Sequence, residues 1–161
     1  MVQRIPISET GYARLKEELN RLSNIERHEV IKAIEVARAH GDLKENAEYH
    51  AAKERQGFIE GRIMELKDKL SRAEIIDCLS LSCDRVVFGT MVTLADLDTD
   101  EEVRYQLLGP EEADMKHNRI SVLSPLGAAM LGKSVGDEVT VKTPAGSRTL
   151  EVLAIVKPDT A

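Results

Sequence analysis

The side chains best suited to chemistry in this sequence lie together in one short turn. The segment from Arg38 to Tyr49 reads RAHGDLKENAEY and carries two acids, Asp42 and Glu45. Two carboxylates at one exposed point can offer oxygen ligands to Mg²⁺, which takes about six oxygens and keeps several waters. Because two carboxylates cannot complete that shell, we expect them to act on a metal already held by another protein and an RNA phosphate. There they would help to orient a water for attack, so the chain would be an accessory to catalysis.

Two other interpretations of the same turn stay open. In the structural one, Gly41 suits the position after a helix, Asp42 suits the N-cap of the next helix, and Glu45 falls where a capping box places its acid. The two acids would then only start the second helix. In the other, His40 and His50 join them in a transition-metal site, which is less favoured because imidazoles near a surface turn are usually solvated.

Basic side chains surround the turn: Arg38, Lys44, Lys53 and Arg55. They could hold a nucleic-acid phosphate close to the acids. Equally, those on the second helix could be ordinary solvent-facing charges balanced by neighbouring glutamates at helical spacing. The residues alone do not decide between these two interpretations.

The elements that must position this turn are two helices. Residues 8 to 76 contain no proline, Ser8 is a suitable N-cap for a first helix, and a second helix is expected over residues 42–75. Apolar residues recur in both at steps of three and four, which predicts an antiparallel two-helix coiled-coil hairpin. The predicted seam residues are Tyr12, Leu15, Leu19, Leu22, Val30, Ile34 and Ala37, facing Tyr49, Ala52, Gln56, Ile59, Ile63, Leu66, Leu70 and Ala73.

The pairing of these seams contains one irregularity. Facing positions have index sums of 85 from Tyr12 to Leu22 and of 86 from Val30 to Ala37, so the first helix holds one extra residue. We predict a local perturbation, a bend, between Ser23 and Glu29. Gly57 and Gly61 face this stretch in the scheme, and their missing side chains would make room for it.

The second half of the chain has a different period. Alternating residues rich in Val and Thr predict strands, and Gly, Pro and Asp clusters separate them. Ser124 is a candidate N-cap for one short helix over residues 125–131. A mainly antiparallel α+β domain is therefore expected. The predicted strands are Arg85–Phe88, Met91–Asp96, Glu102–Leu108, Arg119–Val122, Glu138–Thr143 and Arg148–Val156.

Composition excludes several functional classes. The chain has 161 residues and a net charge of −6, and all of the acidic surplus lies after residue 76. That half should be repelled by phosphate backbones, which argues against strong direct contact with DNA and favours a protein partner. Two cysteines, Cys78 and Cys83, cannot supply a four-ligand zinc site. No apolar run is long enough for a membrane helix and the first residues lack a secretory signal, so we expect a cytoplasmic protein without membrane contact.

The sequence resembles a known family at the turn and in the second half. HGDLKENAEYHAAKERQGF at 40–58 is similar to the hairpin tip of the bacterial Gre transcript-cleavage factors, closest to the GreA type. ISVLSP at 120–125, GKSVGDEV at 132–139 and KTPAG at 142–146 resemble that family's C-terminal domain. The similarity covers nearly the whole chain. It implies a coiled-coil hairpin over 1–76, a linker over 77–84 and an FKBP-like polymerase-binding domain over 85–161.

The resemblance implies a specific activity. Gre factors insert the coiled coil through the secondary channel of RNA polymerase, present two acids to its active-site Mg²⁺, and stimulate cleavage of the 3′ RNA of a backtracked complex. The matching acids are Asp42 and Glu45, and Arg38 and Lys53, with Arg55 beside them, match the basic patch that contacts RNA. The loop at Ser124 and Pro125 matches the contact with the channel rim, although Leu123 stands where the sister factor GreB has Asp.

The expected protein is therefore not an enzyme. It is an accessory factor that acts on bacterial RNA polymerase and the backtracked RNA 3′ end, binds no cofactor tightly by itself, and is expected to be a monomer. Two alternatives remain: a Gre-like inhibitor that occupies the channel without promoting cleavage, and an FKBP-like prolyl isomerase or chaperone. The isomerase calls for an aromatic-lined pocket, and the second half offers only Phe88 and Tyr105.

Overall fold

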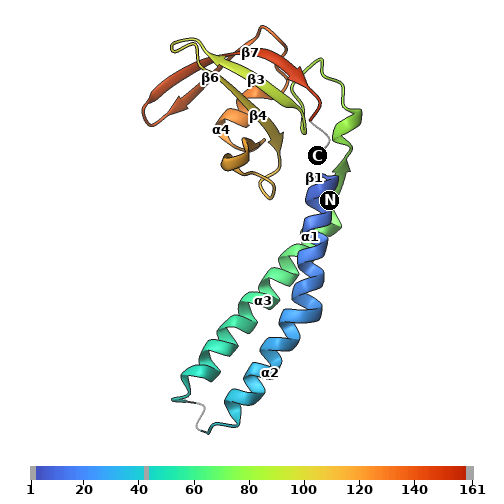
Figure 1. Cartoon of the computed structure of the whole chain (residues 1–161), viewed down its shortest axis with the longest axis vertical. Helices are drawn as coiled ribbons and strands as arrows, with labels where there is room; N and C mark the ends of the chain where they lie inside the picture. Colours follow the sequence, from blue (N-terminus) through green and yellow to red (C-terminus); the bar gives the residue numbers. More distant parts are fainter. Residues whose placement is uncertain (1–2, 42–43, 159–161) are drawn as a thin grey trace. The chain divides into compact units, whose positions relative to one another are not determined.

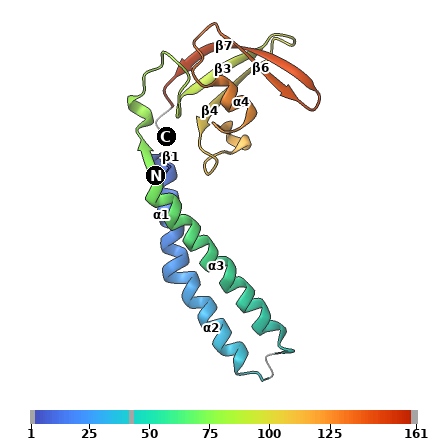
Figure 2. The same ribbon diagram turned by 180° about the vertical axis from the view of Figure 1, so that it is seen from behind.

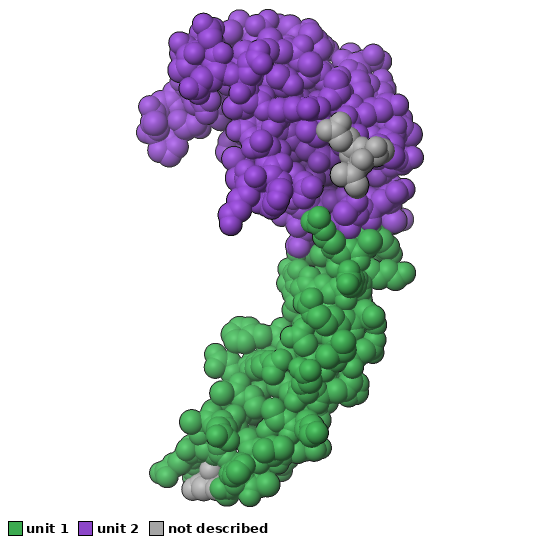
Figure 3. Space-filling view, viewed as in Figure 1, with its two compact units in different colours: residues 1–3, 12–73 green, residues 4–11, 74–161 purple. Residues whose placement is uncertain are grey.

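A computed structural model of the chain describes residues 3–41 and 44–158. It divides into two compact units (Figure 3), Met1–Gln3 with Tyr12–Ala73, and Arg4–Gly11 with Glu74–Ala161. We call them the hairpin unit and the sheet unit. The predicted α+β class is confirmed, with helices dominating the first unit and a mainly antiparallel sheet the second. The segment expected to be a linker, residues 77–84, falls within the sheet unit and includes a 3₁₀ helix, Cys78–Ser80.

The helical part of the chain runs out in one arm and back in the other (Figures 1 and 2). The outgoing arm consists of α1 (Glu9–Arg21), a π-helical segment (Leu22–Glu26) and α2 (Arg27–Arg38), and the returning arm is α3 (Ala47–Arg72). Ser8 caps α1 as predicted, since its Oγ accepts the backbone N–H of Gly11 at 3.0 Å. The two arms form the predicted antiparallel hairpin.

The extra residue in the outgoing arm is accommodated as a π-helical turn. The backbone N–H of Arg27 donates to the carbonyl of Leu22, five residues back, where an α-helix would bond four residues back. Leu22 and Val30, eight positions apart, are thereby both buried, 7% and 0% exposed. The irregularity predicted between Ser23 and Glu29 is confirmed. The explanation through Gly57 and Gly61 is wrong, because a Cβ added at either glycine would meet nothing within 4 Å.

The predicted seam forms the core of the hairpin. Every residue assigned to it is buried or half-buried. The most buried members come from both arms, and Val30 and Leu66 have no exposed surface. A stripe spaced at three and four residues lies on one face of a helix, so each arm buries that face against the other. The buried seam residues are Leu15, Leu22, Val30, Ala37, Ile59, Ile63 and Leu66.

The second helix is shorter than predicted at both ends. It begins at Ala47 instead of Asp42 and ends at Arg72 instead of Ile75. Residues 73–76 form a strand, β2 (Ala73–Ile76), which pairs with β1 (Ile5–Ser8) in a two-stranded sheet. Ala73 and Ile76 suit either structure by residue type. These residues form a strand because they pair with β1, nearly seventy residues earlier in the chain. No local sequence pattern predicts that pairing.

The sheet unit contains a five-stranded sheet in the order β5-β4-β3-β7-β6. All neighbouring strands are antiparallel except β4 and β5, which are parallel. The α-helix α4 (Pro125–Met130) accompanies it, close to the predicted 125–131. The strands are β3 (Met91–Asp96), β4 (Glu102–Leu108), β5 (Arg119–Ser121), β6 (Glu138–Thr143) and β7 (Gly146–Val156).

The strand predicted over Arg85–Phe88 is absent from this described segment. Val86 is fully buried, which explains its apolar character, but it does not join the sheet. Its backbone N–H donates to the carbonyl of Lys133 at 2.8 Å and its carbonyl accepts from Gly132. An apolar run therefore packs into the core through a loop that follows α4. The core itself is formed by Val86, Val92, Leu94, Leu107, Ile120, Met130, Val139, Val141, Leu150, Val152 and Ile155.

Candidate nucleic-acid and polymerase-binding sites

The turn between α2 and α3 carries the candidate acids. Glu45 lies in this turn and is exposed. No hydrogen bond or ion pair joins its carboxylate to the part of the chain that the structure describes. Asp42 lies outside the described residues. Of the two predicted acids, the structure therefore places Glu45, with its carboxylate available to a partner.

The residue that caps α3 is Asn46. Its Oδ1 accepts the backbone N–H of Tyr49 at 3.1 Å, and its backbone is extended, as an N-cap requires. Glu45 precedes the cap, so it cannot occupy the third helical position of a capping box that starts at Asp42. The interpretation in which Glu45 serves to start the second helix is wrong. Asparagine is a preferred N-cap residue, and that preference at position 46 was the signal that sequence reasoning missed.

Further hydrogen bonds hold the turn around Glu45. The Nδ2 of Asn46 donates to the carbonyl of Ala37, in the last turn of α2, at 2.6 Å. The Nε2 of His50 lies 3.1 Å from the carbonyl of Lys44, which accepts a hydrogen bond from the tautomer that carries its hydrogen on Nε2. Both immediate neighbours of Glu45 in the chain are therefore tied to a helix. His50 is exposed but hydrogen-bonded, in contrast to the solvated side chain expected for it.

The predicted basic residues differ in their surroundings. Arg38 ends α2 and is exposed, and Lys53 is exposed on α3 with its Nζ 3.3 Å from the Oε1 of Gln56. Arg55 instead faces the outgoing arm, where its guanidinium lies 3.8 Å from Glu26 and 3.7 Å from Glu29. Arg38 and Lys53 are thus accessible to a phosphate, whereas Arg55 is engaged in balancing acids of the other arm.

Cross-arm ion pairs support the hairpin below the turn. Arg62 makes two hydrogen bonds to Glu18, at 2.9 and 3.0 Å, and Arg27 makes two to Glu60, both at 2.7 Å. The hydrogen bonds from Arg62 hold the pKa of the Glu18 carboxyl below its usual value, and those from Arg27 do the same for the pKa of Glu60. These paired forks fix the rotation of one arm against the other.

The candidate metal chemistry rests on oxygen ligands. Within residues 3–41 and 44–158, no three His, Cys, Asp or Glu side chains come together to form a metal site. The carboxylate of Glu45 is a hard oxygen donor of the kind that Mg²⁺ prefers. A single free carboxylate fits a metal that is held mainly by another molecule.

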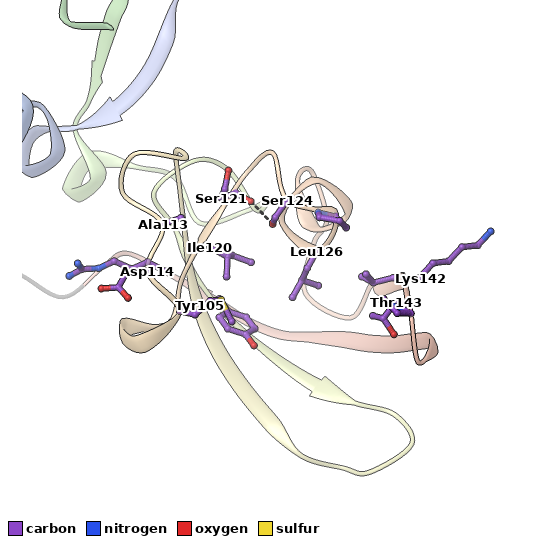
Figure 4. Close-up of a pocket in the computed structure, with 14 residues that line it drawn as sticks. Tyr105, Ala113, Asp114, Ile120, Ser121, Ser124, Leu126, Lys142 and Thr143 are labelled. Atoms are coloured by element: carbon purple, nitrogen blue, oxygen red, sulfur yellow. Dashed lines mark hydrogen bonds between the residues drawn. The ribbon is translucent and has the colours of Figure 1, made fainter. Parts of the chain in front are cut away.

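The second candidate site is the loop at Ser124 and Pro125 in the sheet unit. Ser124 caps α4, because its Oγ accepts the N–H of Gly127 at 3.1 Å. The same Oγ donates to the carbonyl of Ser121 at 2.6 Å (Figure 4). The Ser124 hydroxyl is thus used inside the loop. Pro125 is exposed and Leu123 is 75% exposed, so these two side chains present the surface of the loop.

A largely apolar pocket lies beside this loop. Ser124, Pro125 and Leu126 line one part of it, and Ile120 and Tyr105 another (Figure 4). Tyr105 is the only aromatic ring among the lining residues, and Phe88 is not one of them. The pocket therefore lacks the aromatic lining that the isomerase alternative calls for.

Comparisons with known proteins agree with these two units. The family described as "Transcription elongation factor, N-terminal" matches residues 5–75, and "Transcription elongation factor, GreA/GreB, C-term" matches residues 81–157. The chain is 68% identical to transcription elongation factor GreA of Desulfotalea psychrophila over 100% of both chains. It is 54% identical to GreA of Thermodesulfovibrio yellowstonii over 96% of this chain and 98% of the other.

Solved structures add a more distant relative. The GreA factor homolog 1 (Gfh1) protein of Thermus thermophilus is 33% identical and covers 95% of this chain and 99% of its own, with a TM-score of 0.45. The family assignment therefore rests on the sequence matches and not on this superposition.

The two units and their sequence matches define an elongation-factor architecture made of a helical hairpin and a small sheet domain. The chain belongs to the GreA/GreB family of transcription elongation factors, and the two relatives named above are GreA proteins. This is a family of accessory factors and not of enzymes. None of the helices in the described residues has the length and apolarity needed to cross a membrane.

Proposed function

We propose that this protein binds bacterial RNA polymerase, inserts its hairpin tip through the secondary channel, and stimulates the polymerase's Mg²⁺-dependent cleavage of backtracked 3′ RNA. The role of its own residues is to deliver Asp42 and Glu45 to the polymerase active site. The cleavage leaves a new RNA 3′ end from which an arrested complex resumes elongation. The protein would act in the cytoplasm, as a monomer.

The observation that supports this function most directly is the free carboxylate of Glu45. It is exposed at the end of the hairpin, and the capping role that would have explained it belongs to Asn46. A negative charge on a two-helix projection, unneeded for the fold, is suited to a partner with a positive centre. Membership in an elongation-factor family makes RNA polymerase the expected partner.

Mg²⁺ in the polymerase would supply the chemistry that activates water and stabilises charge on the phosphate. This chain would supply carboxylate oxygens from Asp42 and Glu45, which suit a hard cation. The two acids are too few to hold the ion alone, so tight Mg²⁺ binding by the free protein is not expected. The accessible cations Arg38 and Lys53 would hold the RNA backbone nearby.

The sheet unit would dock on the rim of the channel through the loop at Ser124 and Pro125. The exposed side chains of Pro125 and Leu123 give this loop an apolar surface, while Ser124 keeps its shape through the α4 cap. The acidic excess in this half of the sequence disfavours nucleic acid there and favours a protein surface.

The test is cleavage of RNA in a purified backtracked elongation complex with Mg²⁺. Wild-type protein should shorten the RNA, and Asp42→Ala and Glu45→Ala should each lower the rate about 100-fold or more. Both variants should still compete with wild type for the polymerase. Glu48→Ala is a matched control, since Glu48 is an exposed acid in the first turn of α3, and it should retain the wild-type rate.

Three outcomes would contradict the proposal in different ways. Normal cleavage by both acid variants would remove the role of the tip acids. Cleavage of free RNA without polymerase would show that the protein is itself a nuclease. Binding by wild-type protein that blocks elongation without any cleavage would favour the inhibitor alternative.

A further inference from the structure

Asn46 occupies a position between the ends of two helices, and both ends of its amide are used. Its Oδ1 accepts the N–H of Tyr49 at 3.1 Å, and its Nδ2 donates to the carbonyl of Ala37 at 2.6 Å. The first bond caps the start of α3. The second is an additional bond to the Ala37 carbonyl in the last turn of α2, which also accepts the backbone N–H of His40 at 3.1 Å. One side chain thus closes the hairpin at its turn.

The orientation of this amide is determined by its partners. Turning it over would bring Oδ1 against the Ala37 carbonyl and the NH₂ group against the Tyr49 N–H, so both contacts would become repulsive. The acceptor is also well fixed, because Ala37 is a seam residue with only 2% of its surface exposed. The bond from Asn46 therefore connects the turn to a buried residue of the hairpin core.

Glu45 lies directly between two residues that are held in this way. On one side, the carbonyl of Lys44 lies 3.1 Å from the His50 Nε2, and on the other side stands Asn46. The backbone on both sides of the acid is thus bonded to a helix, while its carboxylate remains exposed. Because the backbone is held on both sides, the positions that the Glu45 carboxylate can reach are limited. The carboxylate itself stays available to a partner.

We propose that Asn46 is a positioning residue for transcript cleavage, acting through the bond from its Nδ2 to the Ala37 carbonyl. That bond holds the Glu45 backbone at a defined distance from α2, so the acid reaches the polymerase active site in a reactive geometry. The proposal rests on the proposed function. It assigns to position 46 a role beyond capping, and the two roles belong to different atoms of one side chain.

Substitutions can separate those atoms. Asn46→Ser and Asn46→Asp both keep an N-cap oxygen for Tyr49, and both lose the amide NH₂ group that donates to the Ala37 carbonyl. Serine leaves the net charge unchanged and aspartate adds a negative charge, so a loss common to both reports the missing donor. Asn20→Asp is the matched control for charge, because Asn20 is an exposed residue of α1 whose Oδ1 accepts from Asn24, a bond that aspartate preserves.

The assay is cleavage in a backtracked complex, measured over a range of factor concentrations. Asn46→Ser and Asn46→Asp should each lower the maximal rate about tenfold, as expected for a misplaced catalytic group, with the half-saturating concentration changed by less than about twofold. Circular dichroism should show unchanged helix content in both variants. Asn20→Asp should match wild type in both parameters.

Wild-type maximal rates in both Asn46 variants would overturn the positioning role. So would a loss that appears only in the half-saturating concentration, because the residue would then serve binding. Glu45→Ala in the same assay distinguishes failure of the positioning role from failure of the proposed function. If Glu45→Ala abolishes cleavage and Asn46→Ser keeps the wild-type maximal rate, only this inference fails. If wild-type protein gives no cleavage, the proposed function fails and the inference with it.

Discussion

The hairpin unit and the sheet unit stabilise themselves in different ways. The hairpin buries a single file of side chains between two arms, and it adds paired Arg–Glu forks across them. The sheet unit packs side chains from several strands and from α4 into one cluster. A seam depends on every residue keeping its rotation about the helix axis, whereas a cluster depends on the volume that it fills.

This difference explains the π-helical turn. Moving the seam by one residue would rotate every later side chain by about 100° and bring polar residues into the interface. The extra residue in Leu22–Glu26 is absorbed within one turn, so the seam continues correctly on both sides. The stability of the hairpin should therefore be most sensitive to changes of register, and the stability of the sheet unit to changes of core packing.

Deleting one residue is the strongest test of register. Removing Lys32, an exposed residue of α2, should rotate Ile34 and Ala37 out of the seam and destabilise the end of the hairpin by about 3 kcal/mol or more. Removing Asn24, an exposed residue of the π-turn, should convert it into regular α-helix and preserve both seams. Hydrogen exchange of the hairpin amides in the full chain measures both. Equal damage from the two deletions would contradict the seam alignment.

Truncating buried leucines compares packing in the two units. Leu107→Ala in the sheet unit should cost about 3–5 kcal/mol, and Leu66→Ala in the hairpin about 2–3 kcal/mol, since a two-helix seam relaxes more easily around a cavity. Both side chains have no exposed surface, so they are matched in burial. Region-resolved hydrogen exchange under native conditions gives each loss separately. A larger cost for Leu66→Ala would mean that the hairpin is the more tightly packed unit.

Acidification tests the carboxylates that each unit uses. The pKa of Glu18 and that of Glu60 are lowered by hydrogen bonds from arginines of the other arm. Their stabilisation is therefore present above the ordinary carboxyl pKa and is lost as the pH falls through the lowered values. Between pH 6 and pH 3 the hairpin should lose stability, and Glu18→Gln should reduce that dependence.

The sheet unit provides the control for acidification. There the pKa of Asp96 is lowered by the backbone N–H groups of Asp98 and Thr99 and by Arg148. Glu18→Gln should leave the pH dependence of the sheet amides unchanged. A change of equal size in both units would show that the acid transition is a property of the whole chain.

The smallest expected effect belongs to a single ion pair. A double-mutant cycle of Glu18→Gln and Arg62→Met should give a coupling of about 0.5–1 kcal/mol, because both side chains are partly exposed. The pair Asp68 and Arg72, within α3, should couple by about 0.3–0.5 kcal/mol. Cross-arm pairs that couple no more strongly than this same-helix pair would show that the forks do not fix the two arms.

The candidate site was predictable to the extent that it follows from residue type and local spacing. The acids at 42 and 45, the basic residues near them and the Ser124 cap can all be read along the chain, and the cap is confirmed. The role of Asn46 was missed because Asp42 and Asn46 are both good N-cap residues. The structure places the cap at Asn46, and the bond from its amide to the Ala37 carbonyl joins residues that no local pattern brings together.

The sequence by itself determined the hairpin, its seam and the single extra residue, because helical periodicity is written in consecutive positions. It also determined the bounds of β3, β4 and β6 as observed, those of β5 to within one residue and those of β7 to within two. Only the tertiary structure decided that the excess becomes a π-turn, that residues 73–76 leave the helix to pair with β1, and that Val86 packs without joining the sheet. Each of these depends on hydrogen-bond or packing partners distant in the chain, which no local pattern contains.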